Sequence, residues 1–132
     1  MATGETCLKT LLANLSPVLA EKRYVFVTLP EALSPAVYEQ ALCIFRETEG
    51  TTVILDADLA DKHGYAYDGY FRQIICKVHS SLDAVGMTAA ISTLLAENGI
   101  SANVVAAYYH DHIFVQEHKA EQAVALMQQL RA

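Results

Sequence analysis

The sequence predicts a mixed α+β protein in which strands and helices alternate along the chain. The stretch Phe71–Leu130 has the predicted order strand, loop, helix, strand, tight turn, strand and helix. The first half shows a looser version of the same order, which suggests an internal duplication. We therefore expect two halves, residues 1–66 and residues 67–132, each of which is very small for an independent domain.

Composition supports a folded chain with an ordinary core. Of the 132 residues, 53% are hydrophobic and 18% are charged, so the chain can bury a core and is not expected to be disordered. The formal charge is −6, and Lys22-Arg23 is an isolated basic pair. Nucleic acids and anionic membrane surfaces are bound by clustered basic residues, so we expect neither as a partner.

The chain shows the features of a cytoplasmic protein. No apolar run approaches the roughly 20 residues that a membrane span needs, and the N-terminus lacks the pattern of a signal peptide. The cysteines Cys7, Cys43 and Cys76 are far apart and form no CxxC pair. This pattern favours free thiols in a reducing compartment and gives no support for a structural zinc site.

The N-terminal half begins with a predicted helix and a predicted strand. Leucines recur at helical spacing over Thr6–Leu15, which predicts an amphipathic helix, and Ser16-Pro17 ends it. Tyr24–Leu29 is rich in β-branched and aromatic residues, so we expect a buried strand that ends at Pro30.

The rest of this half is predicted to contain a loop, a hairpin and a short helix. Ser34-Pro35 resembles a helix cap, but the segment Glu31–Gln40 is short, and we expect a loop with one helical turn. The apolar runs Leu42–Glu47 and Thr51–Leu55 flank a glycine-containing turn, which predicts a hairpin.

A short helix and a connector should follow the hairpin. Asp56 offers an N-terminal cap for the helix, and Gly64 offers a stop. The segment Gly64–Tyr70 holds two glycines and three tyrosines and is the best candidate for the connector between the halves.

The C-terminal half begins with the strand Phe71–Val78. Its alternation places Arg72, Ile74, Cys76 and Val78 on one face and Phe71, Gln73, Ile75 and Lys77 on the other, which fits a sheet with one covered and one wetter face. The next helix has its buried stripe at Met87, Ala90, Ile91, Leu94 and Leu95, and Asn98-Gly99 closes it.

Two strands and a helix complete the chain. The strands Val104–Tyr109 and Ile113–Val115 are predicted to meet at a tight turn formed by His110-Asp111. A second helical stripe follows, made by Ala120, Ala123, Val124, Met127 and Leu130.

The loop between the first strand and the first helix of this half, His79–Gly86, has the composition of a ligand site. It carries two hydroxyls, one carboxylate and one glycine at the start of a helix, where backbone amides attract anions. Gly86 would let a ligand approach the backbone, and Asp83 would receive an ammonium group. The alternative is that Ser80 or Ser81 caps the helix and Gly86 only relieves crowding.

The order of elements in this half, with Ser80-Ser81 and Gly86 at the first loop, resembles an ACT domain. The stretch His79–Gly86 and the run Asn103–His112 are similar to those of stand-alone bacterial ACT-domain proteins, which are related to the ACT repeats of aspartate kinases and to a eukaryotic cytosolic arginine-sensor family. The resemblance implies a ferredoxin-like α+β fold, an antiparallel sheet with helices on one face.

The resemblance also implies two interlocked ACT-like halves and a homodimer. A full ACT unit ends with a fourth strand, whereas this chain ends soon after its last predicted helix. We expect Tyr24–Leu29 to supply the missing strand. By resemblance, an amino acid would bind at the seam between paired units, and the matching positions are Ser80, Ser81, Asp83, Gly86, Met87, Asn103 and Val104.

His110-Asp111-His112 suggests a metal site as one hypothesis, because residues two apart on a strand share a face. Zinc sites in proteins usually have three or four protein ligands, and nothing in the sequence obviously completes this set, although His79 is a candidate. We interpret the segment as a polar hairpin tip, with Asp111 favoured for its turn chemistry. We therefore expect no metal and no cofactor.

Catalysis has no convincing set of residues. His79 adjoins Ser80, but neighbouring residues rarely form a nucleophile and base pair, and no glycine-flanked serine is present. The tyrosines at positions 65, 67, 70, 108 and 109 are interpreted as packing residues. The sequence therefore predicts an amino-acid-binding regulatory module that is not an enzyme, or alternatively a protein-interaction module that binds no ligand.

Overall fold

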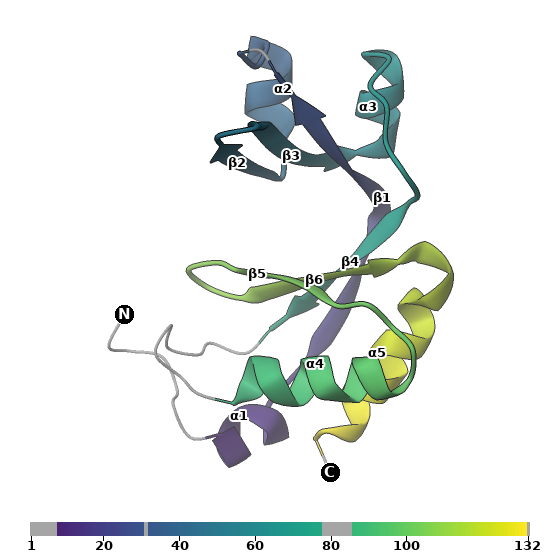
Figure 1. Ribbon diagram of the computed structural model, residues 1–132. Helices are drawn as coiled ribbons and strands as arrows, with labels where there is room; N and C mark the ends of the chain where they lie inside the picture. Colours follow the sequence, from purple (N-terminus) through teal and green to yellow (C-terminus); the bar gives the residue numbers. More distant parts are fainter. Residues whose placement is uncertain (1–7, 31, 78–85, 132) are drawn as a thin grey trace. The chain divides into compact units, whose positions relative to one another are not determined.

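The computed structural model describes residues 8–30, 32–77 and 86–131. Helices and strands alternate as expected for an α+β protein (Figure 1). In chain order the elements are α1 Leu8–Ala13, β1 Pro17–Leu29, α2 Pro35–Gln40, β2 Cys43–Glu47, β3 Gly50–Asp56, α3 Ala57–Lys62, β4 Phe71–Cys76, α4 Met87–Glu97, β5 Asn103–Ala106, β6 Asp111–Gln116, the 3₁₀-helix Glu117–Lys119 and α5 Ala120–Gln129.

The chain forms two compact units. The central unit is Lys22–Phe71, and the terminal unit combines Met1–Glu21 with Arg72–Ala132. Strand β1 contributes its first residues to the terminal unit and its remaining residues to the central unit. The two halves of the chain are therefore interlocked, as the sequence predicted.

The central unit is a β2-β3-β1 sheet with helices α2 and α3. Strand β3 pairs antiparallel with both neighbours, so that Val53 lies opposite Val27 on β1 and opposite Ile44 on β2. The core of this unit contains the sheet residues Val25, Val27, Val53 and Leu55 and the α3 residues Ala57 and Ala60. The predicted hairpin is thus confirmed. Its strand β3 also pairs with the expected strand Tyr24–Leu29.

The two short helices of the central unit start at the caps that the sequence indicated. Ser34 Oγ accepts a hydrogen bond from the Val37 amide at 3.3 Å, and Pro35 occupies the first turn of α2. Asp56 Oδ1 accepts from the Asp58 amide at 2.9 Å at the start of α3. The expected loop with one helical turn is therefore a capped helix, because both cap and proline favour helix initiation.

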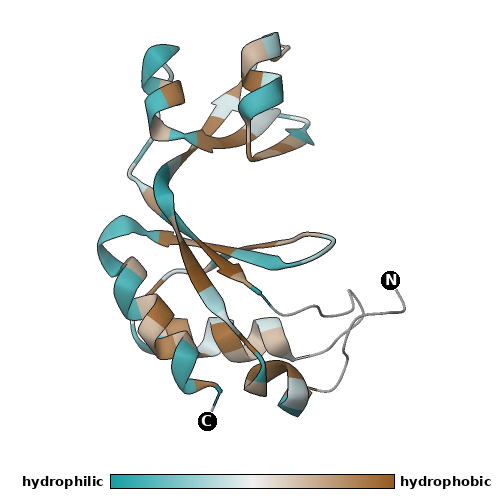
Figure 2. Ribbon diagram, turned by 180° about the vertical axis from the view of Figure 1, so that it is seen from behind, coloured by the Kyte–Doolittle hydropathy of each residue, from teal (hydrophilic) through white to brown (hydrophobic). Residues whose placement is uncertain are grey.

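The terminal unit orders its strands β1-β4-β6-β5 and packs its helices on one side of them (Figure 1). The core is shared by the helices and the two inner strands, and Figure 2 shows the brown apolar stretches along these elements. Its fully buried members include Leu11, Leu15, Ile74, Cys76, Ile91, Leu95, Ile113, Val115 and Met127. These residues include members of the buried stripes that the sequence predicted.

The strand that completes the terminal unit differs from the one expected. It is the first part of β1, before Tyr24–Leu29, which pairs with β3 instead. The Lys77 amide donates to the Ser16 carbonyl at 3.0 Å, and the Arg72 guanidinium donates to the Ala20 carbonyl through Nε at 3.1 Å and Nη2 at 2.6 Å. These bonds join this part of the chain to β4.

The turn between β5 and β6 also differs from the prediction. The Ala107 amide donates to the His110 carbonyl at 3.1 Å, which places Tyr108 and Tyr109 at the tip. His110 and Asp111 therefore do not form the turn, and Asp111 is the first residue of β6. The tyrosines stack edge to face at 4.9 Å and are 57% and 67% exposed, so the packing role expected for them is wrong.

Candidate functional site

The turn into α4 is partly visible at Gly86 and Met87. Ser80, Ser81 and Asp83 lie outside the described residues. Gly86 is the residue before the helix and has φ +102°, a conformation that disfavours residues with a side chain. Because glycine has no side chain, Gly86 itself gives α4 no side-chain cap.

The space beside the Gly86 Cα is occupied by the protein itself. A Cβ atom built at Gly86 would stand 3.0 Å from Leu8 Cδ2 and 3.5 Å from Leu8 Cδ1. Leu8 is the first residue of α1 and remains 36% exposed. The positive φ and the nearby α1 therefore require a glycine at this position, independently of any ligand.

Met87 and Val104 contribute to packing. Met87 is 4% exposed and belongs to the core of the terminal unit, and Val104 packs against the same core opposite Ile113. The Met87 side chain is therefore unavailable for binding, whereas that of Val104 is partly exposed. Their place in the core explains why apolar side chains occur at both positions.

Asn103 lies at the other end of α4. It follows the C-terminal end of that helix and begins β5, the outer strand of the sheet, whereas Gly86 precedes the N-terminal end. Its Nδ2 donates to the Phe114 carbonyl at 3.1 Å across the hairpin. Asn103 therefore has a structural role at the start of β5.

A cluster of titratable groups lies where β4 and β6 adjoin. Burial raises the pKa of the Cys76 thiol to about 12, and the Asp111 carboxylate adds to this shift. Burial also raises the pKa of Asp111, although His112 and His110 oppose the shift. Sequence reasoning placed Asp111 in a turn and so missed its proximity to Cys76.

The surroundings of His112 favour its neutral form. The Gln73 Nε2 atom lies 2.9 Å from His112 Nδ1, and an amide nitrogen can only donate, so this ring nitrogen accepts. Burial lowers the pKa of His112, and repulsion by His110 lowers it further. Gln73 is only 5% exposed, so this side of β4 is drier than the alternation of the sequence suggested.

No metal centre accompanies these histidines in the described part of the chain. Within residues 8–30, 32–77 and 86–131, no three His, Cys, Asp or Glu side chains come together as a potential metal site. The His110 Nδ1 atom is buried and has no hydrogen-bond partner there. Cys43 and Cys76 are free thiols.

The connector residues of the central unit pack as the sequence predicted. The Tyr67 hydroxyl donates to Asp61 Oδ1 at 2.7 Å and lies 3.5 Å from the Tyr70 hydroxyl. These hydrogen bonds, that to Tyr70 first, raise the pKa of Tyr67. Arg23 stacks over the Tyr70 ring at 4.1 Å. These contacts hold the segment against α3 and β1.

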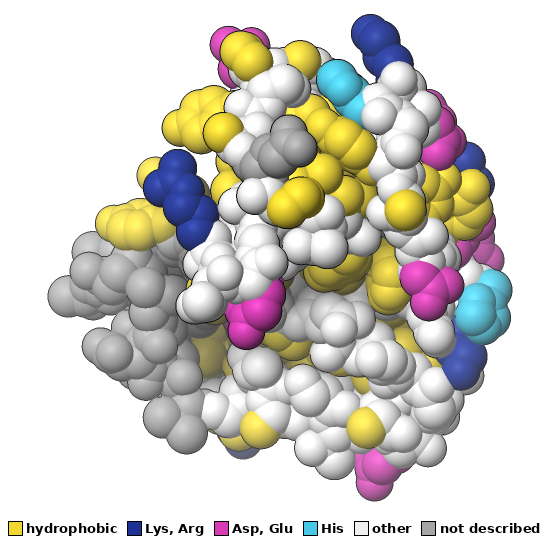
Figure 3. Space-filling view, turned by 45° about the horizontal axis from the view of Figure 1, so that its top comes forward, with side chains coloured by type: hydrophobic (Ala, Val, Ile, Leu, Met, Phe, Trp, Pro, Cys, Tyr) yellow, Lys and Arg dark blue, Asp and Glu magenta, His cyan; other side chains and the backbone are white. Residues whose placement is uncertain are grey.

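Two open grooves are lined by described residues of the central unit. One has a volume of about 430 Å³ and a mixed polar lining that includes Lys22 and Asp56, which pair at 3.7 Å. The other has a volume of about 470 Å³ and is lined by Ala32, Leu33, Pro35, Tyr38, Arg46 and Thr51. On the face drawn in Figure 3, lysine and arginine side chains are scattered and form no continuous basic patch.

The comparisons with known proteins identify the class of protein. One family model of the ACT domain matches residues 3–72, and a second family model of the ACT domain matches residues 71–129. The chain therefore belongs to the ACT-domain family, with two ACT domains in tandem. ACT domains have the ferredoxin-like fold, whose strand order is 4-1-3-2. The terminal unit has the order β1-β4-β6-β5, which matches that order when the first part of β1 is counted as the fourth strand.

Solved structures share this fold. A Vibrio cholerae protein of unknown function, described as a possible transport protein, is 46% identical, with a TM-score of 0.86 over 95% of this chain and 96% of that one. An Agrobacterium tumefaciens protein is 18% identical, with a TM-score of 0.75 over 89% of both chains. The regulatory subunit of aspartate kinase from Thermus thermophilus, in its ligand-free form, is 11% identical, with a TM-score of 0.66 over 86% of this chain and 95% of that one.

The remaining comparisons add two observations. No curated protein matches the chain. None of the helices in the described ranges has the length and apolar character that a membrane span requires.

Proposed function

We propose that this protein is a regulatory module that binds an amino acid and performs no chemistry of its own. The single observation that carries the proposal is the tandem ACT assignment over residues 3–72 and 71–129. The similarity in fold to the regulatory subunit of aspartate kinase supports a regulatory rather than a catalytic role. Under this proposal, residues 1–66 and 67–132 are the two repeats.

The proposed ligand site is the turn into α4. Its members are Ser80, Ser81, Asp83, Gly86 and Met87, and Asn103 and Val104, which lie at the other end of α4, would contribute from β5 of the paired unit. A chemical difference between the two repeats supports this choice. The equivalent helix α2 begins with a serine cap and a proline, whereas α4 begins at a glycine that has no side chain to offer its first amides. These amides suit a carboxylate.

Ligand binding would act by stabilising one arrangement of paired ACT units over another. We propose a homodimer as the assembly and the cytoplasm as the location. The free thiols of Cys43 and Cys76 support a reducing compartment. The net charge of −6 supports small molecules and proteins over nucleic acid as partners.

The alternative function is a protein-interaction module that retains the fold without a ligand. Leu8 favours it, because this side chain occupies the space beside Gly86. Exposed Tyr108 and Tyr109 at the hairpin tip favour it as well, since tyrosine is enriched in protein interfaces.

A thermal-shift screen of the common amino acids against the full chain separates these functions. A ligand at a hundred times its Kd stabilises the folded state by about 2.7 kcal/mol, which raises the Tm by several degrees. Calorimetry on any hit then gives its stoichiometry. If no amino acid raises the Tm at millimolar concentration, the binding proposal is wrong and the interaction function remains.

A further inference from the structure

The groove beside α2 lies where the helix-covered face of the central sheet ends. Arg46 on β2 and Thr51 on β3 are cross-strand partners, and residues two apart on a strand share a face. They therefore stand on the same face as Ile44 and Val53, which belong to the core of this unit. Beyond that core the first turn of α2, with Pro35 and Tyr38, forms the other wall.

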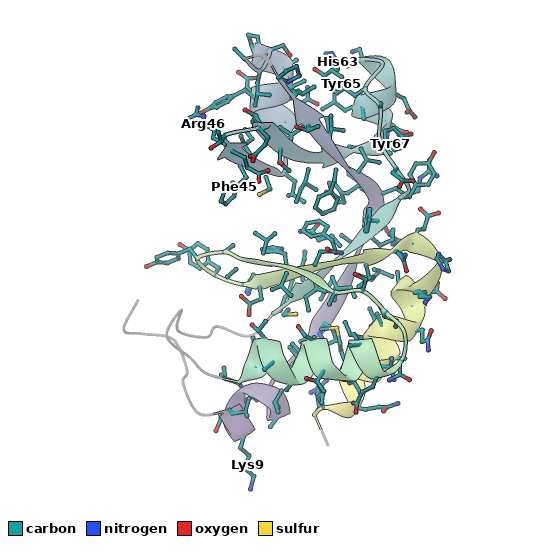
Figure 4. The ribbon with its side chains drawn as sticks, in the orientation of Figure 1. Lys9, Phe45, Arg46, His63, Tyr65 and Tyr67 are labelled. Atoms are coloured by element: carbon teal, nitrogen blue, oxygen red, sulfur yellow. The ribbon has the colours of Figure 1, made fainter. Side chains whose placement is uncertain are left out.

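The lining of this groove combines one cation, two hydroxyls and an apolar wall. Arg46 supplies a guanidinium, Tyr38 and Thr51 supply hydroxyls, and the apolar surface comes from Ala32, Leu33 and Pro35. In the described residues, no acidic side chain lies within 4.0 Å of the Arg46 guanidinium as a salt-bridge partner. Figure 4 shows Arg46 on β2, near the neighbouring Phe45. The guanidinium is thus available to a ligand.

We infer that this groove binds a small organic carboxylate with an apolar or aromatic substituent. A guanidinium holds a carboxylate through two parallel hydrogen bonds, and the hydroxyls of Tyr38 and Thr51 supply further donors. The apolar wall and the Tyr38 ring receive the substituent. The volume of about 470 Å³ is within the range of small-molecule sites.

The lining also sets a preference among carboxylates. None of the described residues that line the groove is acidic, so an ammonium group would find no carboxylate among them to pair with. The groove therefore favours a carboxylate without an α-ammonium group over the amino acid of the same shape, because the ammonium would lie near the like charge of the Arg46 guanidinium. This inference concerns a second site, in the central unit, and is independent of the site at the turn into α4.

The test uses 3-phenylpropionate, with L-phenylalanine and 3-phenylpropan-1-ol as its two closest analogues. The first analogue adds an ammonium group, and the second replaces the carboxylate. The full ¹⁵N-labelled chain is titrated with each by NMR, and the amides of Ala32, Leu33 and Thr51 report binding. We expect saturable shifts with 3-phenylpropionate, weaker binding of L-phenylalanine and no binding of the alcohol.

Variants assign the binding to Arg46. Arg46→Gln should weaken 3-phenylpropionate by about tenfold or more, since a hydrogen bond to a charged group is removed. The affinity of Arg46→Lys for 3-phenylpropionate should fall between those of the parent and Arg46→Gln. Lys62→Gln, which removes an exposed charge from the same unit, should bind as the parent does. The inference fails if 3-phenylpropionate produces no shifts at 10 mM, on the order of the weakest useful affinities. It also fails if the alcohol binds equally or if Arg46→Gln leaves the affinity unchanged.

Discussion

Leu8 of α1 occupies the space that a side chain at Gly86 would need, with its Cδ2 atom 3.0 Å from the position of a Cβ. The two residues are far apart in the sequence, and they meet where α4 begins. The contact links the start of the chain to the proposed ligand site, so that α1 is part of the structural support of that site.

Substituting Gly86 should therefore destabilise the fold before it affects any ligand. Gly86→Ala forces a side chain into φ +102°, at a cost of about 1–3 kcal/mol in unfolding free energy. Most of this cost should persist in a Leu8→Ala background, because the tip of a leucine side chain can move and the backbone angle cannot. Urea unfolding of the parent, both single variants and the double variant measures the coupling. A Gly86→Ala variant as stable as the parent would contradict the positive φ.

Protonation of His112 should destabilise the protein in acid. Its pKa in the folded state lies below the ordinary value, so the unfolded state binds the proton more tightly. The stabilisation is present above the unfolded pKa of about 6.5 and is lost as the pH falls through the folded pKa. Urea unfolding at about pH 8 and about pH 5.5 should show a smaller decrease for His112→Gln than for the parent. The exposed His118→Gln is the control, and an equal decrease in His112→Gln and parent would contradict the prediction.

Removing the Arg72 side chain should loosen the first part of β1. Two donors of its guanidinium contact the Ala20 carbonyl, and a hydrogen bond to a charged group contributes about 1.5–3 kcal/mol when it is well buried. Since Arg72 is only half-buried, we expect Arg72→Met to lower the unfolding free energy by about 1–2 kcal/mol. Hydrogen exchange should localise the effect to the amides of residues 18–21. Arg131→Met, in the same unit, should leave these amides protected, and the prediction fails if both variants behave alike.

Loss of the Ser34 cap should fray α2. Ser34→Ala removes the acceptor of the Val37 amide, and such caps contribute about 0.5–2 kcal/mol. The exposed Ser101→Ala, which lies outside any helix, is the matched control. Urea unfolding measures the difference between the two variants, and equal stability would show that the cap contributes nothing.

Local signals explain which elements were predictable from the sequence. The Ser34-Pro35 pair, the Asp56 cap and the apolar stripes of α4 and α5 act within a few residues, and the structure has each where the pattern indicated. The β2–β3 hairpin is likewise set by a short turn between two apolar runs. These features need no knowledge of distant parts of the chain.

The features that sequence reasoning missed depend on distant partners. The first part of β1 carries Glu21, Lys22 and Arg23 and lacks an alternating pattern, and its strand conformation depends on β4. The hairpin tip shifted to Tyr108-Tyr109, although neither residue favours turns. The Leu8 contact with Gly86 has no local signal at all. The proposed ligand site was therefore predicted from its composition alone, without its surroundings.

The most direct test of the central claim is an NMR titration of the full ¹⁵N-labelled chain with the amino acids that raise its Tm. We expect saturable shifts concentrated at the amides of Gly86 and Met87, with smaller shifts at Asn103 and Val104. Shifts confined to other residues, or no saturable shift with any of the common amino acids, would contradict the proposed binding of an amino acid at the turn into α4.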